Sequence, residues 1–434
     1  MAEVNQLQEI WESFAFTRLL KAFRLAVGPG KLVVALIGIA LITSCGTLMD
    51  IAARNIWSGN HKSTAMKPAI AAIAEYDTPT DYPMFVEKKT TFYALEEFSK
   101  HRGVFSTLWN FCTARFNVAV VSVLESVSPL DTASLLDKVS DVFDNLGLCA
   151  ISLLWAIQKH PVYSVIFLTF VVLVVSFTGG AICRMAALEF SRGEKPGLTE
   201  AMKYSWQKLA GFIAAPTIPI VIMVVAGALI TTLGVIGNIP VAGKILMSLG
   251  LPAALMLGLL ISLFLVGTVV GFNLMFPTIA FEGTNGMDAI SRSFAYVYAH
   301  PWAVTFYGFF AAVYGAISYL VVRFFAYLLL VITYIFLNLG IANASGNEDI
   351  LGKLWTKPEF FNLLRENTEA ARNSTELAAS ILINSSVLVV VALLIAFLFT
   401  FYYSACTIIY SLLREKVDRV SSDKIYIHLD NARD

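Results

Sequence analysis

Charged side chains inside apolar segments are the residues most able to do chemistry in this sequence. Burying an isolated charge in hydrocarbon costs several kcal/mol, so such residues are functional candidates by default. Glu189 and Glu282 each stand at the end of a long apolar run, and arginines lie within a few residues of both. We expect structural ion pairs, Glu189 with Arg184 or Arg192 and Glu282 with Arg292. Pairs at a water-accessible membrane boundary are worth only about 0–1 kcal/mol.

Two alternatives remain open for these charged groups. Glu189 and Glu282 could instead couple proton or ion movement, as intramembrane carboxylates do in transporters. Arg323 lies near the middle of another apolar run. It is a candidate contact for either an outer-leaflet lipid or a partner helix.

The residues that usually build catalytic or metal sites are sparse and scattered. No CxxC or HExxH spacing, phosphate-binding loop or nucleophile elbow occurs. The sequence therefore predicts no enzyme and no catalytic, cofactor or metal site. The cysteines are interpreted as small apolar residues in packed helices; they are Cys45, Cys112, Cys149, Cys183 and Cys406.

The composition indicates that the charged residues named above lie on membrane-spanning helices. Of 434 residues, 57% are hydrophobic and 14% charged, and mean hydropathy is +0.71. Soluble domains have roughly 25% charged residues. Acidic and basic residues balance at 31 each, so no basic surplus favours nucleic acid as a partner.

Six segments are apolar and long enough to cross a bilayer, which takes about 20 residues. The resulting fold class is an all-α polytopic membrane protein. The expected spans are 31–49, 161–187, 210–236, 246–276, 302–338 and 379–410. The fifth is long enough for two spans, but no Gly, Pro or Asn between Gly315 and Asn338 makes a turn, which favours one helix.

Lysine and arginine near the span ends predict the orientation. They gather in 1–30, 188–209 and 411–434, which all lie on one side if there are six spans. The positive-inside rule makes that side cytoplasmic, together with both termini. Residues 50–160 then form an external helical insert, and 342–378 form a second external segment that includes a polar helix running into the last span.

A short amphipathic segment precedes each of the first, third and fifth spans, and the three resemble one another. Aligned on Ala22, Ala201 and Ala289, each has an apolar residue next and a small residue four positions on. Such segments are typical of interfacial helices that turn into a span, here called elbows. The sequence predicts elbows within 188–209 and 282–301, and three units that each join an elbow to a hairpin of spans.

The stretch FPTIAFEGTNGMDAISRSFAYVYAHPWAV, together with Leu188 to Phe212, resembles a broad group of bacterial polytopic membrane families. The group includes the membrane domain attached to some glycerophosphodiester phosphodiesterases, and the opening TRLLKAFRLAVGPGKLVVALIG is similar to N-termini of planctomycete-type membrane proteins. The resemblance covers 160–340 and rests on Glu282, Gly283, Ala289, Arg292, Ser293 and Trp302.

The resemblance does not bring a catalytic site with it. The enzyme's catalytic barrel has an HRG closely followed by an ENT. Here the tripeptides at 101–103 and 366–368 are separated by four predicted spans, and no barrel-sized segment surrounds them. No phosphodiesterase site is predicted, since metal catalysis needs ligands that a supporting shell fixes.

Two functions remain open after this reading. One is a noncatalytic scaffold or accessory subunit of a bacterial inner membrane, held by lipids and docking another membrane or periplasmic protein through the insert. The other is a permease for a small or lipid-like solute. A cavity lined by Arg323 would favour the permease, and closely packed helices would favour the scaffold.

Overall fold

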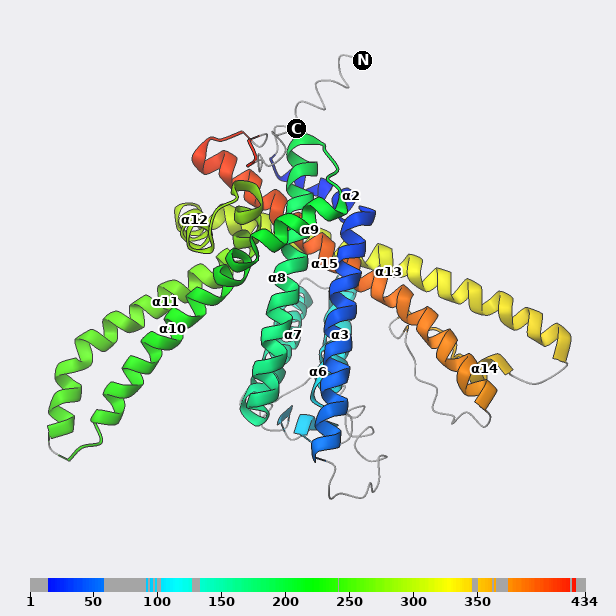
Figure 1. The fold of residues 1–434 in the computed structure, drawn as a ribbon, viewed down its shortest axis with the longest axis horizontal. Helices are drawn as coiled ribbons and strands as arrows, with labels where there is room; N and C mark the ends of the chain where they lie inside the picture. Colours follow the sequence, from blue (N-terminus) through cyan, green and yellow to red (C-terminus); the bar gives the residue numbers. More distant parts are fainter. Residues whose placement is uncertain are drawn as a thin grey trace, which may run out of the picture. The chain divides into compact units, whose positions relative to one another are not determined.

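The computed structural model describes thirteen helical elements and their connections. The described residues are 15–57, 91–92, 94–96, 98–99, 103–126, 133–240, 242–345, 350–360, 363, 374–421 and 424–426. Within these ranges the chain is helical with no strand, so the all-α prediction is confirmed. The elements are η1 (Ala15–Leu20), α2 (Lys21–Ala26), α3 (Pro29–Trp57), α6 (Val104–Ser126), α7 (Ala133–Lys159), α8 (Pro161–Arg192), α9 (Leu198–Gln207), α10 (Leu209–Ile236), α11 (Ala242–Glu282), α12 (Gly286–Ala299), α13 (Pro301–Ser345), α14 (Ile350–Leu354) and α15 (Ser374–Asp418) (Figure 1).

Seven helices in the described part of the chain are long and apolar enough to span a membrane, against the six expected. The expected six all fall within such helices, and 302–338 is one unbroken helix, as predicted. The additional candidate is Ser140–Lys159 of α7, inside the stretch predicted to be external. This segment counts as a candidate span by length and composition alone, because it has 20 residues that include Leu and Ile and few charged side chains.

Three helices are longer than a bilayer needs. At 1.5 Å per residue, the 45 residues of α13 extend about 68 Å, more than twice the hydrocarbon thickness. α15 has the same length and begins at Ser374 in the polar stretch, which agrees with the predicted polar helix running into the last span. α11 has 41 residues.

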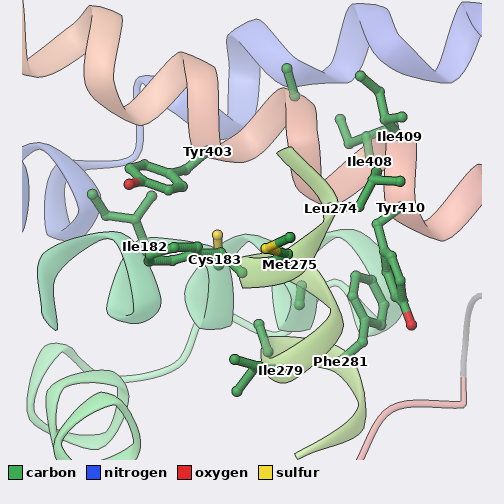
Figure 2. Packing of buried hydrophobic residues seen from close by; sticks show 14 of the residues in the cluster. Ile182, Cys183, Leu274, Met275, Ile279, Phe281, Tyr403, Ile408, Ile409 and Tyr410 are labelled. Atoms are coloured by element: carbon green, nitrogen blue, oxygen red, sulfur yellow. The ribbon is translucent and has the colours of Figure 1, made fainter. Parts of the chain in front are cut away.

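The chain divides into two compact units, and the division falls within α3 and α8. The first unit comprises Met1–Ile39 and Leu173–Asp434, and the second comprises Ala40–Val172. In the first unit the C-terminal parts of α8, α11 and α15 converge on one buried cluster, which we call the hub (Figure 2). α10 and α11 run side by side away from the hub, and α13 pairs with α15 (Figure 1).

The predicted elbows are present as separate helices. α9 stops at Gln207, and Lys208 leaves the helical conformation (φ −101°, ψ 9°) before α10 begins. α12 stops at Ala299, and His300 (φ −139°, ψ 63°) precedes α13. Proline at position 301 suits the first turn of α13, because its missing N–H would have no helical partner there. α2 is the corresponding short helix before α3.

Burial supports the alignment of the three elbows. The alanines at 22, 201 and 289 are at most 1% exposed. The small residues four positions later, Ala26, Ser205 and Ser293, are completely buried. Small side chains at two positions one turn apart let an elbow approach a neighbouring helix closely.

Each elbow packs against a helix that runs toward the hub. Ser205 of α9 donates a hydrogen bond to the carbonyl of Phe177 in α8 (2.6 Å). A Cβ added to Gly271 of α11 would lie 3.6 Å from Ser293 of α12. Thr400 of α15 donates to the carbonyl of Ala26 at the end of α2 (3.0 Å). The first elbow thus packs on α15, the last long helix described.

The apolar stripe of the third elbow contacts other parts of the protein. Ile290 and Val297 of α12 are buried, and the Phe294 ring lies against Gly267 and Phe264 of α11. Other parts of the chain thus cover most of the apolar face of this elbow. The elbow was predicted from a periodicity that does not say which apolar partner it meets.

In the second unit a buried carboxylate holds the start of α6. Asp50 of α3 is 1% exposed and accepts hydrogen bonds from the backbone N–H groups of Phe105 (3.0 Å) and Ser106 (2.9 Å). Tyr163 of α8 donates to the same carboxylate (2.9 Å). A carboxylate satisfies the unpaired N–H groups at a helix N-terminus and complements its dipole. Gly103, at φ +96°, leaves room for Asp50.

A substitution at Gly180 tests the close packing between the elbow α9 and helix α8. A Cβ at 180 would lie 2.6 Å from Phe212 and 2.7 Å from the Ser205 hydroxyl, both of them fully buried. Gly180→Ala should lower the free energy of unfolding by about 1–3 kcal/mol through overpacking. The control Gly227→Ala lies in α10 with nothing within 4 Å of its new Cβ, and it should be neutral or stabilising by up to about 1 kcal/mol. Thermal unfolding in detergent measures both; equal midpoints would contradict the packing.

Candidate functional site

The centre of the hub is filled by side chains of α8, α11 and α15. Cys183 of α8 and Met275 of α11 are completely buried, and Tyr403 of α15 is almost so. Figure 2 shows these side chains facing one another across the three helices. Gly179 allows the approach of Tyr403, because a Cβ there would lie 2.5 Å from the phenol ring. Side chains close the hub where the three helices meet.

The C-terminal end of α11 lies against the hub, and its last carbonyls need partners. The final four carbonyls of a helix have no intrahelical donor. The Arg184 guanidinium donates to the carbonyl of Ala280 (2.8 Å), the Lys208 ammonium to that of Gly283 (2.5 Å) and the Tyr426 N–H to that of Phe281 (2.8 Å). The Tyr204 hydroxyl donates to the carbonyl of Ile279 (2.6 Å). Cationic donors also complement the negative end of the helix dipole.

Arg184 is therefore a capping residue and not the partner of Glu189. Its second donor group binds the carbonyl of Tyr426 (2.8 Å), and its Cζ lies 4.4 Å from the centre of the Tyr204 ring. A planar guanidinium can bind two carbonyls and stack on a ring at once. Burial raises the pKa of Tyr204 to about 12, although Arg184 opposes the shift, so the phenol remains a donor at neutral pH.

Glu189 pairs with Lys31, so the predicted pairing with Arg184 or Arg192 is wrong. The Lys31 ammonium lies 2.6 Å from the Glu189 carboxylate and also donates to the carbonyl of Leu25 (2.7 Å). The Lys31 side chain is 3% exposed. Lys31 is the first residue of the first expected span, where it counts as a basic residue that predicts orientation. A lysine at such a position also needs an acidic partner, and the predicted pairing left this requirement out.

The predicted pair of Glu282 with Arg292 is present. One guanidinium nitrogen of Arg292 lies 2.8 Å from the Glu282 carboxylate. Tyr410 donates to the other carboxylate oxygen (2.7 Å), and Arg414 approaches it at 3.4 Å. Burial lowers the pKa of Arg292, but Glu282 together with Tyr410, Tyr296 and Asp418 raises it, and the net shift is upward. Glu282 thus joins α11 to the elbow α12 and to α15.

Glu282 is more buried than an exposed boundary pair would be. Its side chain is 7% exposed, whereas Arg292 is 47% exposed. The expected value of about 0–1 kcal/mol applies to exposed pairs. A carboxylate that is removed from water, held by two donors and paired with Arg414 is worth more to the fold, and losing it would leave Arg414 without a nearby anion.

Arg323 is held by its own chain, so the prediction of a contact with lipid or a partner is wrong. The side chain is 3% exposed. It donates to the carbonyl of Phe360 and to the Tyr319 hydroxyl, both at 3.0 Å, and its Cζ lies within 6 Å of both ring centres. A cavity of about 480 Å³ lies beside this contact. It is lined by Tyr327, Thr356, Lys357, Pro358, Glu359 and Phe360.

The described residues contain no group of three or more His, Cys, Asp or Glu side chains that could hold a metal ion. Of the two tripeptides considered above, His101, Arg102 and 366–368 lie outside the described residues. The charged groups described above, Lys31, Arg184, Glu189 and Glu282, are bound to other side chains or to backbone carbonyls. Their arrangement fixes helix ends; it places no nucleophile beside a base.

Comparisons with protein-family models, curated proteins and solved structures find no match to this chain. The resemblance to the membrane domain attached to glycerophosphodiester phosphodiesterases therefore stays a prediction. The architecture that is established is an all-α polytopic membrane chain whose helices converge on a closed hub.

Arg184 can be compared with Arg192, an exposed arginine two turns further along α8. Arg184→Ala leaves the carbonyls of Ala280 and Tyr426 without their donor, so the free energy of unfolding should fall by at least about 2 kcal/mol. Arg192→Ala should change it by less than about 0.5 kcal/mol. Thermal unfolding in detergent measures both; similar values would show that Arg184 does not cap α11.

The Lys31–Glu189 pair can be tested by removing one partner and then both. Glu189→Gln leaves the buried ammonium without a carboxylate and should destabilise the protein by about 3 kcal/mol. The double variant Lys31→Met, Glu189→Met removes both charges and should recover most of that loss. Unfolding midpoints measure the difference. A double variant less stable than Glu189→Gln would contradict a buried pair at this position.

Proposed function

We propose that this protein is a noncatalytic membrane scaffold or accessory subunit that docks a partner protein through its α6–α7 insert. The closed hub carries the proposal. A permease needs a binding space between its helical units, commonly lined by broken helices or unpaired polar groups. Here Cys183, Met275 and Tyr403 fill that position.

The pairing of the charged side chains also supports a scaffold over a permease. Glu189, Glu282, Arg184 and Arg323 all have partners inside the chain. Moving Glu189 alone would leave the buried Lys31 ammonium without its carboxylate, at a cost of about 3–5 kcal/mol. Moving Arg184 or Arg323 would leave a carbonyl without its donor, at a cost of about 1–3 kcal/mol. Such groups favour a fixed framework over a moving one.

The outer parts of α10 and α11 support placement in lipid. Within the chain, only 11% of the most apolar 18-residue window of each helix is buried. Val224 of α10 and Leu255 and Met256 of α11 are about two-thirds exposed. Exposed apolar surface of this extent needs hydrocarbon or another protein around it.

The insert offers the surface that we propose for docking. α6 packs against α7, and Leu95, Leu108 and Trp155 are buried in a small core of their own. Further apolar side chains of both helices remain exposed, including Trp109 and Leu154. An insert with its own core can present such a surface as a unit, and aromatic residues are enriched at protein interfaces.

Localisation in an inner membrane, with both termini cytoplasmic, belongs to the same proposal. The exposed basic side chains of the first unit that support it lie on the elbows and the connections at the hub: Lys21, Arg24, Lys195 and Lys203. The positive-inside rule assigns this end to the cytoplasm, where basic residues also meet anionic lipid heads.

Photo-crosslinking in native membranes tests the proposal. A photoreactive amino acid at Trp109 or Leu154 should give adducts with one protein, while the matched position Val224 on α10 should react with lipid. Protein adducts at Val224 with none at Trp109 and Leu154 would contradict docking through the insert.

A flux measurement tests the permease reading directly. The protein is reconstituted in lipid vesicles and supplied with a panel of labelled small solutes and short-chain lipids. The scaffold proposal expects no uptake above empty vesicles. Uptake that Glu282→Gln abolishes, while the unfolding midpoint stays unchanged, would establish a permease in its place.

A further inference from the structure

Two cysteines of the second unit lie side by side across the α6–α7 interface. Cys149 of α7 places its sulfur 4.0 Å from the carbonyl oxygen of Cys112 in α6. Ser152, one turn after Cys149, lies 3.6 Å from the Cys112 sulfur. Both cysteines are partly exposed, whereas Cys183 and Cys406 are buried in the first unit.

Small side chains make this approach possible. Cys149 and Ser152 lie one turn apart on α7, and both contact Cys112 of α6. A disulfide joins cysteines whose Cα atoms are about 4.4–6.8 Å apart. The Cys149 sulfur lies 4.0 Å from the carbonyl oxygen of Cys112 itself, so the two residues are neighbours across the interface.

The surroundings of Cys112 favour the reactive form of its thiol. The Cys149 thiol and the Ser152 hydroxyl lie next to Cys112, where hydrogen bonds from them stabilise a thiolate on Cys112. These bonds lower the pKa of Cys112 although burial opposes them. The thiolate is the form that attacks a disulfide.

We propose that Cys112 and Cys149 form a disulfide that joins α6 to α7 in an oxidising external compartment. The Cys112 thiolate attacks a disulfide of an external thiol oxidant, and one sulfur of that oxidant leaves as a thiolate. Cys149 then loses its proton to solvent, and its sulfur attacks Cys112 in the mixed disulfide. The second oxidant sulfur leaves, so two cysteines are oxidised and the oxidant is reduced to its dithiol.

The bond would fix one end of the insert without moving the helices. Cys112 lies two turns into α6, and Cys149 lies in the second half of α7. The Asp50 carboxylate already holds the start of α6. With the disulfide, α6 is tied to two other helices, and the surface carried by the insert becomes rigid.

The test follows the thiols of the purified protein and of native membranes. Purified protein is treated with oxidised glutathione, free thiols are alkylated with iodoacetamide, and the digest is analysed by mass spectrometry. We expect a linked peptide pair containing Cys112 and Cys149, and a higher unfolding midpoint after oxidation. Cys112→Ser and Cys149→Ser should abolish both effects, and the control Cys45→Ser should retain them.

Membranes alkylated with iodoacetamide at lysis show whether the bond forms in the cell. We expect neither thiol to be modified before reduction. Free, alkylated Cys112 and Cys149 after treatment of the purified protein would overturn the geometry. A bond that forms in detergent while both thiols are alkylated in membranes would overturn its occurrence in the cell. Neither result depends on whether a partner docks on the insert.

Discussion

The end of α11 imposes a constraint on which the first unit depends. A helix that stops among apolar side chains must have its last carbonyls bound, since water cannot reach them. Arg184, Tyr204, Lys208 and Tyr426 supply donors from three segments of the chain. One requirement of the backbone thereby links the positions of α8, the second elbow and residues 424–426.

The elbows fix the positions of further helices through close packing. Each elbow contributes two small, buried positions one turn apart, and each packs on a helix that runs toward the hub. Glu282 and Glu189 then join helices that close packing has already brought together. Close packing determines where the helices lie. Charge pairing raises the free energy of other arrangements, because they would leave buried charges without partners.

The sequence predicts much of this arrangement, and its failures have one physical origin. Apolar length gave all six expected helices and kept 302–338 whole, and the alignment of Ala22, Ala201 and Ala289 identified equivalent buried positions. Glu282 was paired correctly with Arg292 because both lie within one connection. Lys31 was missed as the partner of Glu189 because 158 residues separate them. Local spacing has no access to a contact that only tertiary packing creates.

The same limit applies to Arg184 and Arg323. Their partners are mostly backbone carbonyls, and a carbonyl is present at every residue, so no sequence pattern marks it. Asp50 was overlooked because it stands beyond the first predicted span, at residues 31–49, and because its partners are the N–H groups of α6. For polar residues near the ends of membrane helices, hydrogen bonds to the ends of neighbouring helices should therefore be considered before ion pairs.

The contact between Ala26 and Thr400 has a consequence for synthesis. It joins residues 374 positions apart, and at roughly 5–20 residues per second the ribosome needs roughly 20 to 75 s to cover that distance. Until α15 emerges, the face of α2 that carries Ala26 lacks the helix on which it packs. This contact between the first elbow and α15 can therefore form only after the segments between them have been made.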